Sequence, residues 1–159
     1  MFKKLLLLSL IITLVTGCSE KTLSTDVIQN GDELSNVNKL EAFIQNSKNH
    51  KEDEIRIVRN YGDKSYGISK DKEEELERQG LQLPEGSVTY TLKYRYDKKA
   101  KQGWIEVKTD ATNFKQSTTY STSLADSQQC GYIKKDGERG YYMLTECFHQ
   151  WEYELFPLQ

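Results

Sequence analysis

The chain has 159 residues, and its 22 Lys and Arg against 24 Asp and Glu give a formal net charge of −2. This length suits one domain with a modest core, and the charge has the wrong sign for a nucleic-acid-binding protein or a polybasic membrane-surface protein. Aromatic residues make up 11% of the chain against a hydrophobic total of 36%, so we expect Tyr, Phe and Trp to build much of the core.

The chain begins with the features of an export signal. An apolar run of eleven residues, Leu5 to Val15, follows Lys3 and Lys4. This run has about half of the roughly 20 residues that a membrane span needs. A basic flank and a short apolar run before small residues are typical of a secretory signal peptide. The stretch Leu14-Val15-Thr16-Gly17-Cys18 at its end resembles the lipobox of bacterial lipoproteins.

The lipobox resemblance implies that residues 1–17 are removed and that Cys18 becomes an N-terminus carrying a diacylglyceryl group and palmitate. The mature chain then has 142 residues (159 minus 17) and a net charge of about −4 (22 minus Lys3 and Lys4 gives 20 basic residues against 24 acidic ones). Two acyl chains bind a membrane stably. We therefore expect an exported protein that is lipid-anchored to the outer face of the cell membrane through Cys18.

Residues 18–25 are expected to form a short polar tether. Asp26 lies eight positions after Cys18, which limits that distance to ~28 Å in an extended chain. Residues 26–159 are then expected to form a single domain. The remaining cysteines, Cys130 and Cys147, are an even pair in an exported chain and predict a disulfide; two free thiols are the alternative.

An amphipathic helix is predicted near the start of this domain. Its apolar residues recur at three- and four-residue steps, and Ser35 is a candidate N-cap. These apolar residues are Leu34, Val37, Leu40, Phe43 and Ile44. Residues 55–58 then predict a short strand, and Tyr66 to Ser69 a second one.

The segment Asp71 to Gln79 is charged throughout apart from Leu76 and a final Gln79, and Gly80 follows it as a candidate C-cap. We expect a solvated surface helix. Binding of a cation such as calcium is the alternative, but calcium loops bring their carboxylates together from a tight turn with a glycine, which this segment lacks.

Two hairpins are predicted in the second half of the chain. Residues 88–96 alternate strictly between apolar and polar side chains and pair with residues 104–109. A second hairpin joins residues 130–133 to residues 139–149. A four-residue loop, Gly137 to Gly140, would set Cys130 opposite Cys147. That register also places one apolar set on a single face; the set is Tyr141, Met143, Thr145, Cys147, Trp151, Tyr153 and Leu155.

These elements predict an α+β fold. We expect the N-terminal amphipathic helix to pack on an antiparallel sheet of four to five strands, with a C-terminal disulfide-linked hairpin.

Several segments resemble a family of small lipoproteins from Gram-positive bacilli that share a domain of unknown function. They are Asp26-Val27-Ile28, Ser35-Asn36, Lys39-Leu40-Glu41-Ala42-Phe43, Asp53-Glu54-Ile55-Arg56-Ile57-Val58, Ser117-Thr118-Thr119, Cys130 and Tyr142-Met143-Leu144-Thr145-Glu146-Cys147. The chain departs from the family pattern in two places. Asp71 to Gln79 looks inserted, and about ten residues separate Thr119 from Cys130. The resemblance implies no activity and no catalytic residue.

No motif in the chain points to a reaction. His50 and His149 are the only histidines, and neither lies in a metal-ligand spacing. We predict no catalytic residue, no metal site and no cofactor. Carboxylates such as Glu106, Asp110 and Glu146 leave an envelope-polymer hydrolase as an alternative, and a structural or stress-related envelope protein is a third reading.

The aromatic side chains are the better indication of function. Tyr90, Tyr94, Tyr96 and Trp104 lie on adjacent predicted strands, and Tyr and Trp are favoured at binding surfaces. Core packing is the alternative explanation. We expect a non-enzymatic binding or inhibitory module of the bacterial envelope. Its partners would be the membrane, through Cys18, and an envelope protein or glycan, with no nucleic acid.

Overall fold

A computed structural model describes residues 23–31, 33–61, 70–80, 84–115 and 126–158. The predicted signal peptide, Cys18 and the strand predicted at Tyr66 to Ser69 lie outside these residues. In the described part of the chain, neither helix has the length and apolar character that crossing a membrane requires.

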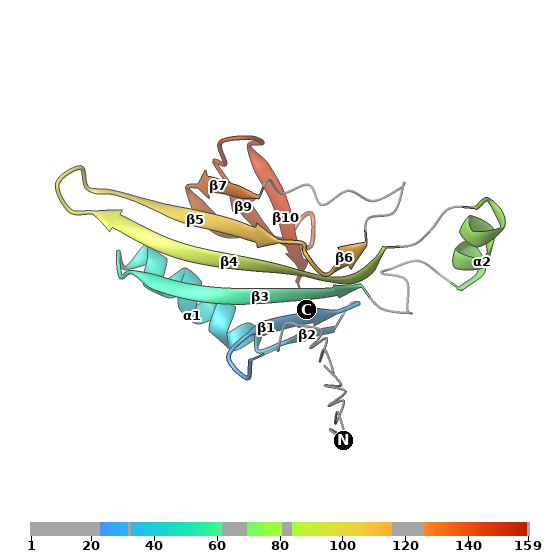
Figure 1. The fold of residues 1–159 in the computed structure, drawn as a ribbon. Helices are drawn as coiled ribbons and strands as arrows, with labels where there is room; N and C mark the ends of the chain where they lie inside the picture. The colour runs from blue at the N-terminus through green and yellow to red at the C-terminus, as the bar shows by residue number, and fades with distance from the viewer. Residues whose placement is uncertain (1–22, 32, 62–69, 81–83, 116–125, 159) are drawn as a thin grey trace, which may run out of the picture.

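A seven-stranded sheet forms the larger part of the fold (Figure 1). Its spatial order is β2 (Glu33–Ser35), β1 (Val27–Asn30), β3 (Asp53–Tyr61), β4 (Glu85–Asp97), β5 (Gln102–Asp110) and β7 (Ser127–Cys130), with β6 (Phe114–Lys115) also paired to β4. The β1–β3 pair is parallel and the other pairs are antiparallel. The predicted hairpin of residues 88–96 and 104–109 is confirmed as β4 and β5.

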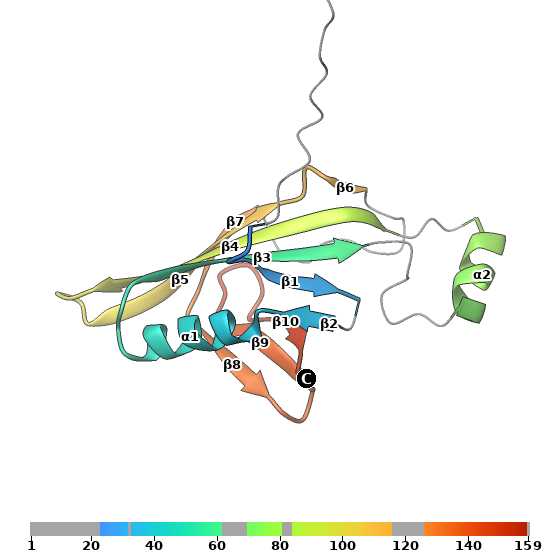
Figure 2. The ribbon, with the colours of Figure 1, turned by 90° about the horizontal axis from the view of Figure 1, so that it is seen from below.

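A three-stranded antiparallel sheet is built from β8 (Tyr132–Asp136), β9 (Tyr141–Thr145) and β10 (Glu152–Pro157). The helices are α1 (Val37–Lys48) and α2 (Lys70–Arg78). Figure 2 shows α1 and the small sheet on the same side of the large sheet, whereas α2 lies apart, beyond one end of it. Helix α2 confirms the charged helix predicted at Asp71 to Gln79, and Gly80 follows it with φ +72°.

The predicted α+β fold, with an N-terminal helix on a sheet of four to five antiparallel strands, is wrong. The described chain is mostly β, with two sheets and two short helices, and two strands precede α1. The missed strands β1, β2, β6 and β7 have two to four residues each. So few residues cannot show a clear period of two. Strands β1, β6 and β7 pair with the long strands β3, β4 and β5, and β2 pairs with β1.

The start of α1 also differs from the prediction. Ser35 ends β2, and the N-cap is Asn36 in the left-handed region at φ 60°. The Asn36 side-chain amide does not cap the helix but donates to the backbone oxygen of Asp26 at 2.7 Å. Asn tolerates this backbone conformation better than most residues, so Asn36 turns the chain from β2 into α1.

One core lies between the elements. It is formed by the inward-facing side chains of both sheets together with the apolar face of α1. The members that are most completely buried include Leu40, Phe43, Ile57, Leu92, Ile105, Leu144, Leu155 and Phe156. Aromatic residues supply Phe43, Tyr90, Tyr94, Tyr142, Tyr153 and Phe156 to this core, as their abundance in the sequence suggests.

A polar cluster joins α1 to the small sheet. Tyr142, on β9, donates its hydroxyl hydrogen to Glu41 on α1, and Lys135 Nζ lies 2.7 Å from the same carboxylate oxygen. Partial burial acts to raise the pKa of Glu41, but the hydrogen bonds from Lys135 and Tyr142 outweigh it and hold that pKa below its ordinary value. Glu41 therefore stays ionised at neutral pH and fixes α1 against β8 and β9.

The second hairpin has the predicted register. Tyr132 pairs with Thr145 and Asp136 with Tyr141, which leaves the four-residue loop Gly137 to Gly140 between the strands. The Cys130–Cys147 disulfide is also confirmed. However, Cys130 ends β7 of the large sheet instead of lying in the hairpin, so the disulfide connects the two sheets. This corrects the expectation of a disulfide-linked hairpin.

Candidate functional site

The four aromatic residues proposed from sequence do not form one exposed stripe. Tyr90 and Tyr94 are buried in the core, with 3% and 4% of their surface exposed, and Tyr96 follows them on the same side of β4. Trp104 is half-buried on the opposite side of the sheet, because its neighbour Ile105 points into the core. Tyr90 and Tyr94 are thus in contact with other core side chains and are not accessible to an external partner.

Tyr94 and Tyr96 hold the loop after α1. His50 Nδ1 lies 3.2 Å from the Tyr94 hydroxyl oxygen, and the His50 ring stacks on the Tyr96 ring with centroids 4.4 Å apart. Burial raises the pKa of Tyr94, and the neighbouring Tyr96 adds to this shift. Tyr94 is therefore a neutral phenol at physiological pH, and this group of side chains is structural.

Among the residues that the structure describes, the most exposed aromatic side chains lie elsewhere, in the turn between β9 and β10. We call residues 147–151 the aromatic turn. Phe148 is 85% exposed and Trp151 is 66% exposed. The sequence pattern placed Trp151 on the buried face together with Tyr153, but the chain leaves the strand geometry after β9, where Glu146 has φ +56°. Alternation therefore does not continue through this turn, and Trp151 points outward.

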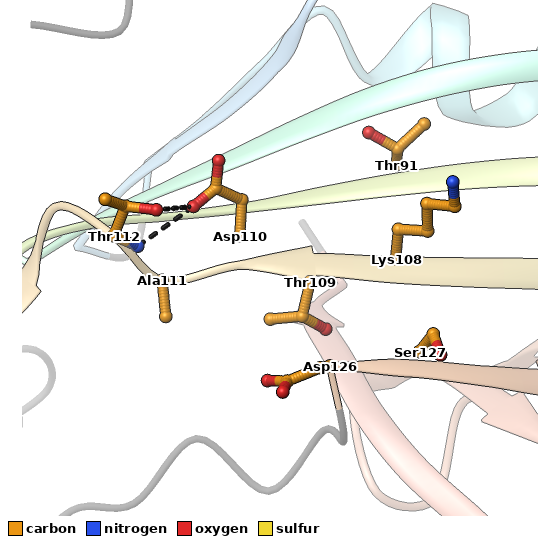
Figure 3. A pocket seen from close by; sticks show the side chains of 8 residues that line it. All are labelled: Thr91, Lys108, Thr109, Asp110, Ala111, Thr112, Asp126 and Ser127. Carbon is orange, nitrogen blue, oxygen red and sulfur yellow. Dashed lines mark hydrogen bonds between the residues drawn. The ribbon is translucent and has the colours of Figure 1, made fainter. Parts of the chain in front are cut away.

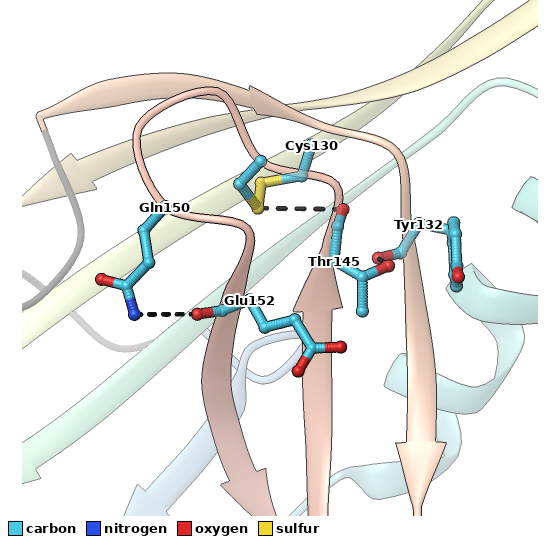
Figure 4. Close-up of a disulfide and its surroundings, with 6 residues drawn as sticks. Cys130, Tyr132, Thr145, Gln150 and Glu152 are labelled. Atoms are coloured by element: carbon cyan, nitrogen blue, oxygen red, sulfur yellow. Dashed lines mark hydrogen bonds between the residues drawn. A yellow bond between two sulfur atoms is a disulfide. The ribbon is translucent and has the colours of Figure 1, made fainter.

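Covalent and hydrogen bonds fix the aromatic turn (Figure 4). The disulfide attaches Cys147 to the end of β7. The Phe148 N–H donates to the backbone oxygen of Gln129 at 3.0 Å, and the Gln150 side-chain amide donates to the backbone oxygen of Glu152 at 3.0 Å. A turn held in this way loses little conformational freedom when it binds a partner. The two exposed rings are thus presented by a rigid support.

A polar hollow of about 380 Å³ adjoins the aromatic turn on the side of Gln150. Its charged residues include Arg139 and Glu152, whose side chains are paired at 2.8 Å, and Glu154, which is exposed. An apolar centre bordered by polar and charged side chains is the usual anatomy of a protein–protein interface. Here two exposed aromatic residues lie on a turn that adjoins a charged hollow through Gln150.

A second, more open hollow of about 660 Å³ lies at the end of β5 (Figure 3). Lys108 and Asp110 point to one side of the strand there, and Thr109 points to the other. Hydrogen bonds from the hydroxyl and backbone N–H of Thr112 hold the pKa of Asp110 below its ordinary value. A carboxyl that ionises this readily is a poor general acid, because general-acid carboxyls need a raised pKa.

The carboxylates considered for hydrolysis are not brought together. Glu106 and Asp110 lie four residues apart on one strand, a separation of ~13 Å along β5. The paired carboxyl groups of glycosidases lie roughly 5–9.5 Å apart. Glu106 is also paired with Arg95 at 3.4 Å, and Glu146 lies in the other sheet's connection between β9 and β10. This geometry gives no support to a two-carboxylate mechanism.

The acidic helix α2 has the form of a solvated surface helix. Glu74, Glu75 and Glu77 are exposed on it. Across the described residues, no three His, Cys, Asp or Glu side chains gather in a way that could hold a metal ion.

A family model for a domain of unknown function, DUF4362, matches residues 24–122, which is more than half of the chain. The protein belongs to the DUF4362 family. No curated protein and no solved structure matches the chain significantly. The matched residues contain α1, α2 and the strands from β1 to β6, so the disulfide, the small sheet and the aromatic turn lie after them.

Proposed function

We propose that this DUF4362 protein is a non-enzymatic binding module of the bacterial envelope, whose binding element is the aromatic turn. The observation that carries the proposal is the exposure of Phe148 and Trp151 on a turn that a disulfide and main-chain hydrogen bonds hold in place. Soluble surfaces seldom leave two large aromatic side chains this open without a contact for them to make.

A protein is the partner that this surface suits best. Aromatic side chains in a protein–protein interface provide much of the binding energy, at about 2 kcal/mol or more for each hot-spot residue. The rings of Phe148 and Trp151 would enter an apolar pocket of the partner, and the charged border around Arg139 and Glu152 would contact its rim. A glycan is a less suitable ligand, because Phe148 and its neighbour His149 pack edge to face at 5.2 Å and form no flat platform.

The proposal includes attachment to the outer face of the cell membrane by lipid on Cys18, as in small lipoproteins of Gram-positive bacilli. The supporting observations are the lipobox-like residues 14–18 and the signal-like run that precedes them. The short interval between Cys18 and Asp26 would keep the domain within ~28 Å of the bilayer surface. The module would then meet other envelope proteins at the membrane.

The anchor is tested by Cys18→Ser. Without the thiol no diacylglyceryl group is added, so we expect the protein to leave the membrane fraction and appear with the soluble exported proteins. Fractionation of cells expressing each form measures this, and Ser19→Ala serves as a control for a substitution beside Cys18. Membrane fractionation of Cys18→Ser like that of the wild type would contradict the anchor.

The binding element is tested with Phe148→Ala/Trp151→Ala as immobilised bait in a detergent extract of the envelope. We expect the wild type to retain a discrete protein, identified by mass spectrometry, that the double variant loses. Leu23→Ala is the control, because Leu23 is also an exposed apolar residue, at 49%, but lies outside the turn. If every protein retained by the wild type is also retained by the double variant, the aromatic turn is not the binding element.

A further inference from the structure

A group of lysines lies at the tip of the β4–β5 hairpin. Lys98, Lys99 and Lys101 follow one another within six residues, 97–102, all of which are exposed. Figure 1 shows this hairpin extending past the end of α1, so its tip projects from the rest of the fold. Among the described residues, none of these three lysines takes part in an ion pair.

The tip has a defined shape. Asp97 Oδ1 accepts hydrogen bonds from the backbone N–H groups of Lys99 at 2.7 Å and Ala100 at 3.1 Å. Lys101 then takes the left-handed conformation, with φ 52°, which returns the chain to β5. The Asp97 carboxylate is thus used to hold the turn, and the lysine side chains are left to extend into solvent.

Further cations lie at the same end of the molecule. His50 stacks on Tyr96 and places the loop after α1 beside the hairpin. Lys48 and Lys51, on either side of that loop, are exposed. Residues 48–53 and 97–101 together therefore carry five lysines and three carboxylates, those of Glu52, Asp53 and Asp97. This local excess of positive charge contrasts with the net charge of −2 for the whole chain.

We propose that the lysine tip, residues 98–101, contacts the anionic phospholipid headgroups of the membrane that carries the protein. This inference rests on the proposed lipid anchor. Asp26 immediately precedes Val27, the first residue of β1. Val27 pairs with Ile57 of β3, and Ile57 pairs with Tyr90 of β4, so the start of β1 lies level with Tyr90. Lys98 is eight residues further along the hairpin, or ~26 Å. The tether to Cys18 spans up to ~28 Å, so lipid and tip reach one bilayer surface.

The bilayer suits the tip better than a soluble anion does. A lysine near an anionic membrane surface strengthens binding by about fivefold, so all three lysines must find anionic groups at once, which a bilayer of anionic headgroups offers and a single small anion does not. Attachment of the same chain by lipid makes the contact intramolecular, and weak contacts become effective under that condition. The negative charge of the remaining chain is repelled by the same surface. The tip would therefore fix which side of the domain faces the membrane.

The experiment uses the mature chain with Cys18→Ser, which removes the contribution of the lipid. Its partition onto vesicles of phosphatidylglycerol and of phosphatidylcholine is measured by co-sedimentation at low salt. We expect binding to the anionic vesicles only, and a loss of about fivefold for each lysine replaced in Lys98→Gln/Lys99→Gln/Lys101→Gln. The control, Lys39→Gln/Lys108→Gln/Lys115→Gln, makes the same charge change at exposed lysines outside the tip.

Two results would overturn the inference. One is equal partition of the Cys18→Ser chain onto both kinds of vesicle, and the other is an equal loss of binding in the tip and control variants. Neither result bears on the anchor, which the fractionation of Cys18→Ser tests separately, or on the aromatic turn. An anchored protein whose tip variant and control variant behave alike would be held by its lipid alone.

Discussion

Replacing both cysteines, as Cys130→Ala/Cys147→Ala, is expected to lower the free energy of unfolding by about 3 kcal/mol. The disulfide closes a segment of 17 residues and connects β7 of the large sheet to the end of β9 in the small sheet. Removing it gives the unfolded chain more freedom. Both cysteines are buried, so alanine avoids leaving a hydroxyl without a partner.

Urea unfolding of the variant and of the oxidised wild type measures this difference. The reduced wild type is the matched control, because it lacks the crosslink but keeps both side chains, and it should show nearly the same loss. Hydrogen exchange gives a second readout, since the Phe148 N–H, which donates to Gln129, should exchange faster in the variant. A loss below about 1 kcal/mol with unchanged exchange would mean that the disulfide does not hold the aromatic turn.

Arg56→Met is expected to lower the free energy of unfolding by about 3 kcal/mol, because it leaves a buried carboxylate without its cation. Asp26 has no exposed surface, and its two carboxylate oxygens each lie 3.2 Å from a nitrogen of Arg56. The Leu23 N–H also donates to this carboxylate, at 2.7 Å, but a neutral donor cannot replace a full charge. The methionine keeps the length of the side chain and removes its charge.

Lys93→Met is the matched control for Arg56→Met. Lys93 pairs with Glu54 at 2.8 Å, but both side chains are substantially exposed. Exposed ion pairs contribute about 0–1 kcal/mol, so this variant should change stability little. Adding Asp26→Asn to Arg56→Met should recover part of the loss, since no buried charge then remains. Equal effects of the Arg56 and Lys93 variants in urea unfolding would show that the Asp26–Arg56 pair is not special.

The two hairpins and the disulfide could be predicted from the sequence, because each depends on a local pattern of residues or on the number of cysteines. The alternation in residues 88–96 is strong enough to define β4 and its pairing with β5, and the four-residue loop that the apolar pattern favoured, Gly137 to Gly140, gives the observed register of β8 and β9. Likewise, two cysteines that remain after a predicted export signal were sufficient to predict the disulfide. In each case the prediction rests on the alternation of apolar residues or on the number of cysteines, and both can be read without knowledge of the tertiary fold.

The fold class and the exposure of the aromatic turn could not be predicted in this way. Alternation tells which side chains share a face of a strand, but not which face another sheet will cover. Alternation alone therefore leaves Tyr90 and Tyr94 as candidates for exposure as well as for burial, and the tertiary packing buries both. Trp151 was predicted to be buried and is exposed, because Glu146, in the left-handed conformation, interrupts the two-residue alternation before it. That backbone conformation has no clear signature in the residue type.

The aromatic turn is tested most directly by measuring the affinity of the purified partner. The affinity for the wild type is compared with that for Phe148→Ala/Trp151→Ala. Two hot-spot residues at about 2 kcal/mol each predict a loss of more than about a hundredfold, carried mainly by faster dissociation. Circular dichroism and urea unfolding of the double variant should match the wild type, because both side chains are largely exposed. An affinity within about threefold of the wild type, in a variant that is folded, would contradict the proposed binding role of the turn.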